Sequence, residues 1–214
     1  MTRFARLGGW IAVFAVPLAA ATDTTALLEG VEQRYNRPRT LQMQFEQSQS
    51  GQGRITRSES GTLSLQKPGR MRWDYAVPQG KIFLSDGKFV YYYNPVTSKV
   101  SRTKLKQSDD LRAPLAFLMG RLDFHRDFKE FRTQPEGEDV YVIATPKSDR
   151  APYTQVAFLV APDYRIKLLR VNGQDHSIIV YRMSEEQVNP ALDASLFRFK
   201  MPAGAILVDE DEIE

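Results

Sequence analysis

Residues 61–95 read GTLSLQKPGRMRWDYAVPQGKIFLSDGKFVYYYNP, and this stretch decides the fold. Apolar and polar residues alternate along most of it, which is typical of strands with one buried face. Two Pro/Gly clusters and an Asp-Gly pair divide it into antiparallel strands joined by tight turns. The expected strands are 61–67, 71–76, 81–85 and 88–94. They carry so many aromatic and other bulky apolar side chains that the sheet must pack against something.

The segments on either side of this stretch add helices and further strands. Residues 23–36 form an amphipathic pattern with Asp23 as the N-cap, so we expect a helix that ends before Pro38. A second apolar stripe, in DDLRAPLAFLMGRL at 109–122, predicts a helix that begins near residue 113. Residues 49–60 are polar and are expected to form a loop. The remaining expected strands are 40–48, 98–105, 127–134, 139–145, 153–161, 164–172, 175–184 and a last one around Phe197 and Phe199.

Strands therefore flank the helical segments without β-α-β alternation. This order is typical of the α+β class, and it predicts a single strongly curved antiparallel sheet with helices on one side.

Residues 1–21 have the pattern of a secretory signal peptide. Two arginines precede an apolar run at 7–18, and three alanines at 19–21 provide a small-residue cleavage site. The run is shorter than the ~20 apolar residues that span a bilayer, so a membrane anchor is the weaker interpretation. We expect residues 22–214 to form one exported domain. Loss of the two arginines lowers the formal net charge from +3 to +1, which does not indicate a nucleic-acid partner.

The chain contains no cysteine, which excludes disulfides, thiolate nucleophiles and cysteine metal ligands. It also excludes a lipid-modified cysteine at the cleavage site, so we expect the mature chain to be soluble rather than lipid-anchored. A domain of this length can bury enough apolar surface to fold without crosslinks.

No arrangement of residues in the sequence indicates catalysis. The two histidines, His125 and His176, are expected at the surface, and Asp86 is best explained as a turn residue. The chain has no G-x-S-x-G motif, no Gly-rich phosphate loop and no cluster of metal ligands with the required spacing. We therefore expect neither an enzyme nor a bound metal or cofactor.

The aromatic strands have two interpretations. In the first, their side chains form an ordinary core between the sheet and the helices. In the second, the curved sheet wraps an apolar cavity that the helices at 23–36 and 113–122 close as a lid, and the protein binds lipid or acyl chains. A third possibility, from a different functional class, is a module that binds a partner peptide at an open sheet edge.

Short motifs along most of the chain resemble the periplasmic outer-membrane lipoprotein carrier family, LolA. The matching residues are Phe45-Glu46-Gln47, Gly61-Thr62-Leu63, Lys67-Pro68, Arg72-Trp73, Ser85-Asp86-Gly87-Lys88, Tyr93-Asn94-Pro95, Pro114-Leu115, Asn189, Phe197-Arg198-Phe199, Pro202 and Gly204. Each motif is weak alone, but their order and spacing together are specific.

The resemblance implies an unclosed β-barrel with a helical lid over a hydrophobic cavity. It also implies a monomeric periplasmic carrier that accepts lipoproteins from an inner-membrane ABC transporter and delivers them to an outer-membrane lipoprotein receptor. An envelope lipid-binding or stress-sensing module of the same fold is the alternative. The residues expected to bind lipid are Leu63, Leu65, Met71, Trp73, Tyr91, Leu115, Leu118 and Phe158. Both faces of the strands at 81–94 are apolar, so the sequence leaves open which face of them points inward.

Lys67 departs from the family pattern, in which an arginine stands before this proline and holds the lid. The resemblance therefore gives Lys67 the role of lid gate. Lysine keeps the charge but replaces a planar fork of donors with one ammonium group.

Overall fold

A computed structural model describes residues 23–51, 54–105, 122–149 and 151–209 of the chain. The predicted signal peptide and most of the predicted helix at 113–122 lie outside these ranges. No helix within them is long and apolar enough to cross a membrane.

Within the described ranges, twelve strands form one sheet in the order β12-β6-β5-β4-β3-β2-β1-β11-β10-β9-β8-β7. Neighbouring strands are antiparallel except for β12 and β6, which are parallel. The first strands of the sequence are β1 (Thr40–Gly51), β2 (Arg54–Gln66), β3 (Arg70–Val77), β4 (Ile82–Asp86), β5 (Phe89–Asn94) and β6 (Lys99–Lys104). The others are β7 (Phe128–Glu136), β8 (Asp139–Pro146), β9 (Tyr153–Val160), β10 (Ile166–Gly173), β11 (Ile178–Val188) and β12 (Ile206–Asp209).

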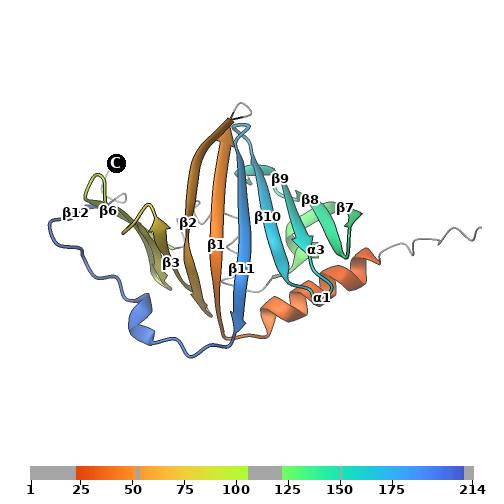
Figure 1. Ribbon diagram of the computed structural model, residues 1–214, viewed down its shortest axis with the longest axis horizontal. Helices are drawn as coiled ribbons and strands as arrows, with labels where there is room; N and C mark the ends of the chain where they lie inside the picture. Colours follow the sequence, from red (N-terminus) through yellow and green to blue (C-terminus); the bar gives the residue numbers. More distant parts are fainter. Residues whose placement is uncertain (1–22, 52–53, 106–121, 150, 210–214) are drawn as a thin grey trace, which may run out of the picture.

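The edge strands β12 and β7 lie at opposite ends of this order, so the sheet does not close into a barrel. The sheet twists strongly from one edge to the other (Figure 1). The prediction of one large, curved, unclosed antiparallel sheet in an α+β fold is confirmed.

Helix α1 (Thr24–Asn36) lies across one face of the sheet, below β11, β10 and β9 in Figure 1. Its predicted N-cap is confirmed, because the Asp23 carboxylate accepts hydrogen bonds from the backbone N–H groups of Thr25 and Ala26. The side chains of Leu28, Val31 and Tyr35 are buried against the sheet. We call the face of the sheet that packs against α1 the α1 face. A short helix, α3 (Phe124–Asp127), leads into β7.

The strand register determines which side chains share the α1 face. Leu63 pairs with Trp73, and Trp73 pairs with Phe83 in β4, so these three side chains point to the α1 face. Leu84 pairs instead with Arg72 and therefore points to the opposite face.

The opposite face is covered near β3 and β4 by the segment that follows β11. This segment forms a 3-10 helix, η1 (Ala194–Phe197), which packs against β3 and β4. Arg72 fixes it by donating a hydrogen bond to the backbone carbonyl of Leu196, at 3.1 Å. Leu84, Val100 and Phe197 are buried here, outside the main core cluster. The sheet therefore buries apolar side chains on both faces.

Two local predictions are wrong. Residues 49–51 and 54–60 are strand rather than loop, because β1 and β2 stay paired as far as Gly51 and Arg54. The last strand is at Ile206–Asp209, whereas Phe197 ends η1 and Phe199 follows it. Phe197 and Phe199 alternate with Arg198 because this segment packs onto the opposite face of the sheet, and not because it forms a strand.

Candidate functional site

The α1 face carries an aromatic cluster at its centre, contributed by β1, β3 and β11. The ring of Phe45 lies edge-on to Trp73, with 4.5 Å between centroids, and also to Tyr75, at 5.2 Å. The ring of Tyr181 lies 5.7 Å from Trp73. Trp73 is only 4% exposed, while Tyr75 is half-buried. These contacts join strands that are far apart in the sequence into one apolar wall.

A second aromatic group lies on the same face, near α3. Phe158 of β9 stacks on Phe124 with 5.1 Å between ring centroids. The rings of Phe128 and Phe131 surround Phe124 at 6.3 and 6.4 Å. Both groups belong to one continuous cluster, so the apolar wall extends from β3 to β9.

Five of the eight residues predicted to bind lipid lie together in this cluster: Leu63, Leu65, Met71, Trp73 and Phe158. Each is less than 5% exposed. Leu115 and Leu118 lie outside the described residues. Whether any of these side chains contacts lipid stays a prediction.

Tyr91 does not share the face of the other five residues. It pairs with Leu84 of β4, which points away from α1, and its ring stacks on Phe199 with 4.6 Å between centroids. The expectation that Tyr91 lines the same wall as Trp73 is therefore wrong. The alternation of residues could not predict the face of Tyr91, because the opposite face of β4 and β5 is also covered and both faces of these strands carry apolar residues.

The structure adds partly accessible apolar residues that the predicted set omits. Tyr75 and Phe83 are half-buried on the α1 face, beside Trp73, and Met183 of β11 also packs there. The period of two along β3 predicts the orientation of Tyr75 from that of Trp73. Phe83 requires the β3–β4 register, which the sequence alone does not provide.

A buried ion pair lies on the same face, next to Tyr75. The Lys81 ammonium donates to both carboxylate oxygens of Glu59, at 2.6 and 2.7 Å. It also lies 4.2 Å from the centroid of the Tyr75 ring. Lys81 and Glu59 are 6% and 5% exposed. The pair places a compact polar group in the apolar wall. Sequence reasoning missed it because Glu59 lies in β2 and Lys81 lies just before β4, 22 residues later.

Lys67 contacts the end of α1. Its ammonium donates a hydrogen bond to the backbone carbonyl of Tyr35, in the last turn of the helix. The last carbonyls of a helix have no partner within it, and the helix dipole favours a cation there. Partial burial lowers the pKa of Lys67. Lys67 therefore caps α1, and its predicted role as a lid gate stays a prediction.

A polar network under α1 fixes the helix to the sheet. The Tyr35 hydroxyl donates to the Glu186 carboxylate of β11, at 2.7 Å, and accepts from the backbone N–H of Ile166, at 2.9 Å. Arg34 donates two hydrogen bonds to the same carboxylate, at 2.5 and 3.1 Å. Burial and the neighbouring Glu186 charge raise the pKa of Tyr35. The network keeps the apolar side of α1 against β10 and β11.

Helix α1 also holds the chain next to α3, at Leu122 and Phe124. The Asn36 side chain donates to the carbonyl of Leu122, at 2.8 Å, and accepts from its N–H, at 2.7 Å. The Glu32 carboxylate accepts from the backbone N–H of Phe124, at 2.7 Å. A displacement of α1 would therefore also affect the chain that precedes α3.

The described residues contain no group of three or more His, Asp or Glu side chains able to hold a metal ion. His125 and His176 are exposed, as predicted. The ring of His125 lies edge-on to Phe131, with 5.4 Å between centroids.

Comparison with known proteins gives a consistent result. Residues 36–200 match the sequence model of the family described as outer membrane lipoprotein carrier protein LolA. The chain is 30% identical over 201 residues to the outer-membrane lipoprotein carrier protein of Bordetella avium, covering 91% of this chain and 94% of the relative. It is 32% identical over 176 residues to the protein of the same name from Dechloromonas aromatica, covering 80% and 82%.

Among solved structures, an uncharacterized conserved protein from Thermus thermophilus has a similar fold, with a TM-score of 0.51 and 12% sequence identity. The similarity covers 86% of this chain and 98% of that one. At this identity it supports the fold alone.

Proposed function

The chain belongs to the LolA family of outer membrane lipoprotein carrier proteins, and we propose that it carries lipoproteins by holding their acyl chains against the α1 face. The observation that carries this proposal is the continuous apolar wall from β3 to β9, with half-buried Tyr75 and Phe83 beside the buried Trp73. An apolar surface of this kind, partly open at β3 and β4, suits a flexible hydrocarbon chain.

The driving force of the proposed carriage is the burial of hydrocarbon. Each CH₂ group removed from water contributes about 0.8 kcal/mol. A carrier must also release its cargo, so its affinity has to stay below that of the receiving site. The proposed cycle makes and breaks no covalent bond, and it needs neither a cofactor nor a metal.

The proposal includes a route and a location. The predicted signal peptide and the family relationship support a periplasmic carrier. We propose that it receives lipoproteins from an inner-membrane ABC transporter and delivers them to an outer-membrane lipoprotein receptor, acting as a monomer. The family relationship supports this route.

Fluorescence quenching tests acyl-chain binding at the α1 face. In the chain from Thr22 onward, Trp73 is the sole tryptophan. A lipopeptide with acyl chains brominated near the methyl end should quench Trp73, whereas an unbrominated one should not. Phe83→Ala should weaken this binding because Phe83 shares the face of Trp73. Tyr93→Ala is the matched control, because Tyr93 pairs with Ile82 on the opposite face.

Native mass spectrometry of protein purified from the periplasm tests the cargo. Bound acylated protein supports the carrier. A ligand-free chain in tight complex with a protein partner, combined with no quenching of Trp73, contradicts it and favours the sensing module.

A further inference from the structure

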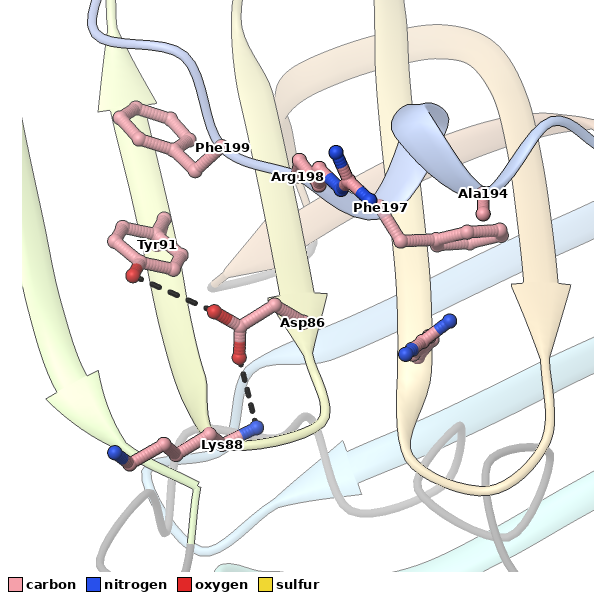
Figure 2. A pocket seen from close by; sticks show the side chains of 8 residues that line it. Asp86, Lys88, Tyr91, Ala194, Phe197, Arg198 and Phe199 are labelled. Carbon is pink, nitrogen blue, oxygen red and sulfur yellow. Dashed lines mark hydrogen bonds between the residues drawn. The ribbon is translucent and has the colours of Figure 1, made fainter.

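Two of the sequence motifs that resemble the carrier family meet at a pocket on the opposite face from the proposed acyl-chain wall. The first, Ser85–Lys88, makes the turn between β4 and β5, and the second, Phe197–Phe199, follows η1. They lie more than a hundred residues apart in the sequence. Between them is a pocket of about 410 Å³, within the range of small-molecule sites (Figure 2). The proposed acyl-chain carriage makes no use of this pocket.

The charges at the pocket are unbalanced. Arg70 of β3, Lys88 of the turn and Arg198 after η1 line it, against a single carboxylate, Asp86. None of the three cations has a carboxylate within ion-pair distance among the described residues. The Arg70 guanidinium donates a hydrogen bond to the neutral Gln66 side-chain amide oxygen, at 3.0 Å.

The Asp86 carboxylate is already engaged by its own turn. One oxygen accepts from the backbone N–H groups of Lys88 and Phe89, at 2.7 and 2.8 Å. The other faces the Tyr91 hydroxyl, at 3.5 Å, as Figure 2 shows. The carboxylate therefore shapes the turn. Among the residues that line the pocket, three cations face this one carboxylate, which is a formal surplus of two positive charges.

One wall of the pocket is aromatic. The rings of Tyr91 and Phe199 are parallel to within 1°, with 4.6 Å between their centroids. This stacked pair lies beside the charged groups in Figure 2. An apolar wall next to surplus cations suits a ligand with an anionic group at one end and an organic group at the other.

We infer that this pocket binds a phosphate monoester. Two guanidinium groups offer forks of donors that fit phosphate oxygens. Lys88 adds a third positive charge to the lining, although its ammonium points away from Arg198 in Figure 2 and lies 5.3 Å from the centroid of the Phe89 ring. A phosphate monoester carries a charge of about −1.5 to −2 near neutral pH, which matches the surplus of two better than a single carboxylate does. The organic substituent lies along the Tyr91–Phe199 wall. The monoester is either a soluble metabolite or the headgroup of a lipid such as phosphatidic acid.

Calorimetric titration with sn-glycerol 3-phosphate at low ionic strength tests the inference, and vesicles of phosphatidylcholine with phosphatidic acid distinguish the two sources. Binding of the soluble ester supports a soluble ligand, and binding to the vesicles alone supports a lipid headgroup. Binding should weaken with added salt because all three cations are exposed. Arg198→Gln should weaken it by about tenfold, and Arg198→Lys by less.

A second test variant and a control variant with the same charge change accompany Arg198→Gln. Lys88→Gln is a second test, because Lys88 is exposed at a turn and its replacement leaves the core intact. Arg132→Gln, an exposed arginine of β7, removes the same charge away from the pocket and should leave binding unchanged. The inference is overturned if neither source binds, or if inorganic phosphate or an acidic peptide binds as tightly as the ester. Equal losses in Arg198→Gln and Arg132→Gln would also overturn it.

Discussion

Glu186→Ala should destabilise the protein by about 3 kcal/mol, because it breaks the network that holds α1. The Glu186 side chain is 5% exposed and accepts hydrogen bonds from both Arg34 and Tyr35. Breaking a buried ion pair costs about 3–5 kcal/mol, and a buried hydroxyl without an acceptor costs about 1–3 kcal/mol. The Arg34 side chain is 24% exposed and also donates to the carbonyl of Asp163, so its loss is partly offset by water.

Urea unfolding at pH 7, followed by circular dichroism, measures this loss. Tyr35→Phe removes the other end of the same hydrogen bond, so the two substitutions should not be additive. We expect a coupling energy of about 1 kcal/mol between them. Glu138→Ala, an exposed glutamate in the β7–β8 turn, is the matched control and should change stability by less than about 0.5 kcal/mol. A loss below about 1 kcal/mol in Glu186→Ala, or additivity with Tyr35→Phe, would refute the proposed anchor.

Three further predictions concern the same framework. Folding raises the pKa of Tyr35 above its ordinary value of 10.0, so the contribution of Tyr35 to the free energy of unfolding should be constant below pH 10 and should fall as the pH rises above 10. Urea unfolding at several pH values measures this fall, which should be shallower in Tyr35→Phe. Lys67→Met should cost about 1 kcal/mol by removing the cap on the Tyr35 carbonyl, and Lys67→Arg should restore most of it in the same assay. Gly61→Ala should destabilise the protein by about 3 kcal/mol in thermal unfolding, because the added Cβ would lie 2.0 Å from the Asp74 carbonyl oxygen. Gly51→Ala is the control and should be nearly neutral, because open space surrounds Gly51. Equal effects at both glycines would argue against the close approach at Gly61.

Local patterns predicted much of this fold because local physical chemistry determines it. Asp23 caps α1 as its position before an apolar periodic run indicates, and the alternation in 61–76 places Leu63 and Trp73 on one buried face. The polar strand ends at 49–51 and 54–60 were missed because their pairing comes from neighbouring strands, as where Ser50 pairs with Ile178, and not from a buried apolar face of their own.

The parts of the site that sequence could not predict depend on long-range contacts. Tyr35 and Glu186 are separated by 151 residues, and no local signal connects them. The face on which Tyr91 lies follows from its pairing with Leu84, and Phe199 packs on that face from the far end of the chain. Where a sheet is covered on both faces, the period of two no longer identifies the buried face, since apolar residues lie on both faces of the strand.

The Glu186 network that anchors α1 and the accessible part of the apolar wall lie on different halves of the sheet. The contacts of Glu186, Ile166 and the Tyr164 ring fix α1 to the β9–β11 side, where that ring occupies the space beside Gly30. Half-buried Tyr75 and Phe83 lie on β3 and β4, beyond β1 and β2. An acyl chain that enters at β3 and β4 would therefore meet aromatic side chains without first displacing the Glu186 network. It follows that loosening α1 through Glu186→Ala should lower stability more than it lowers acyl-chain affinity, whereas Phe83→Ala should do the reverse.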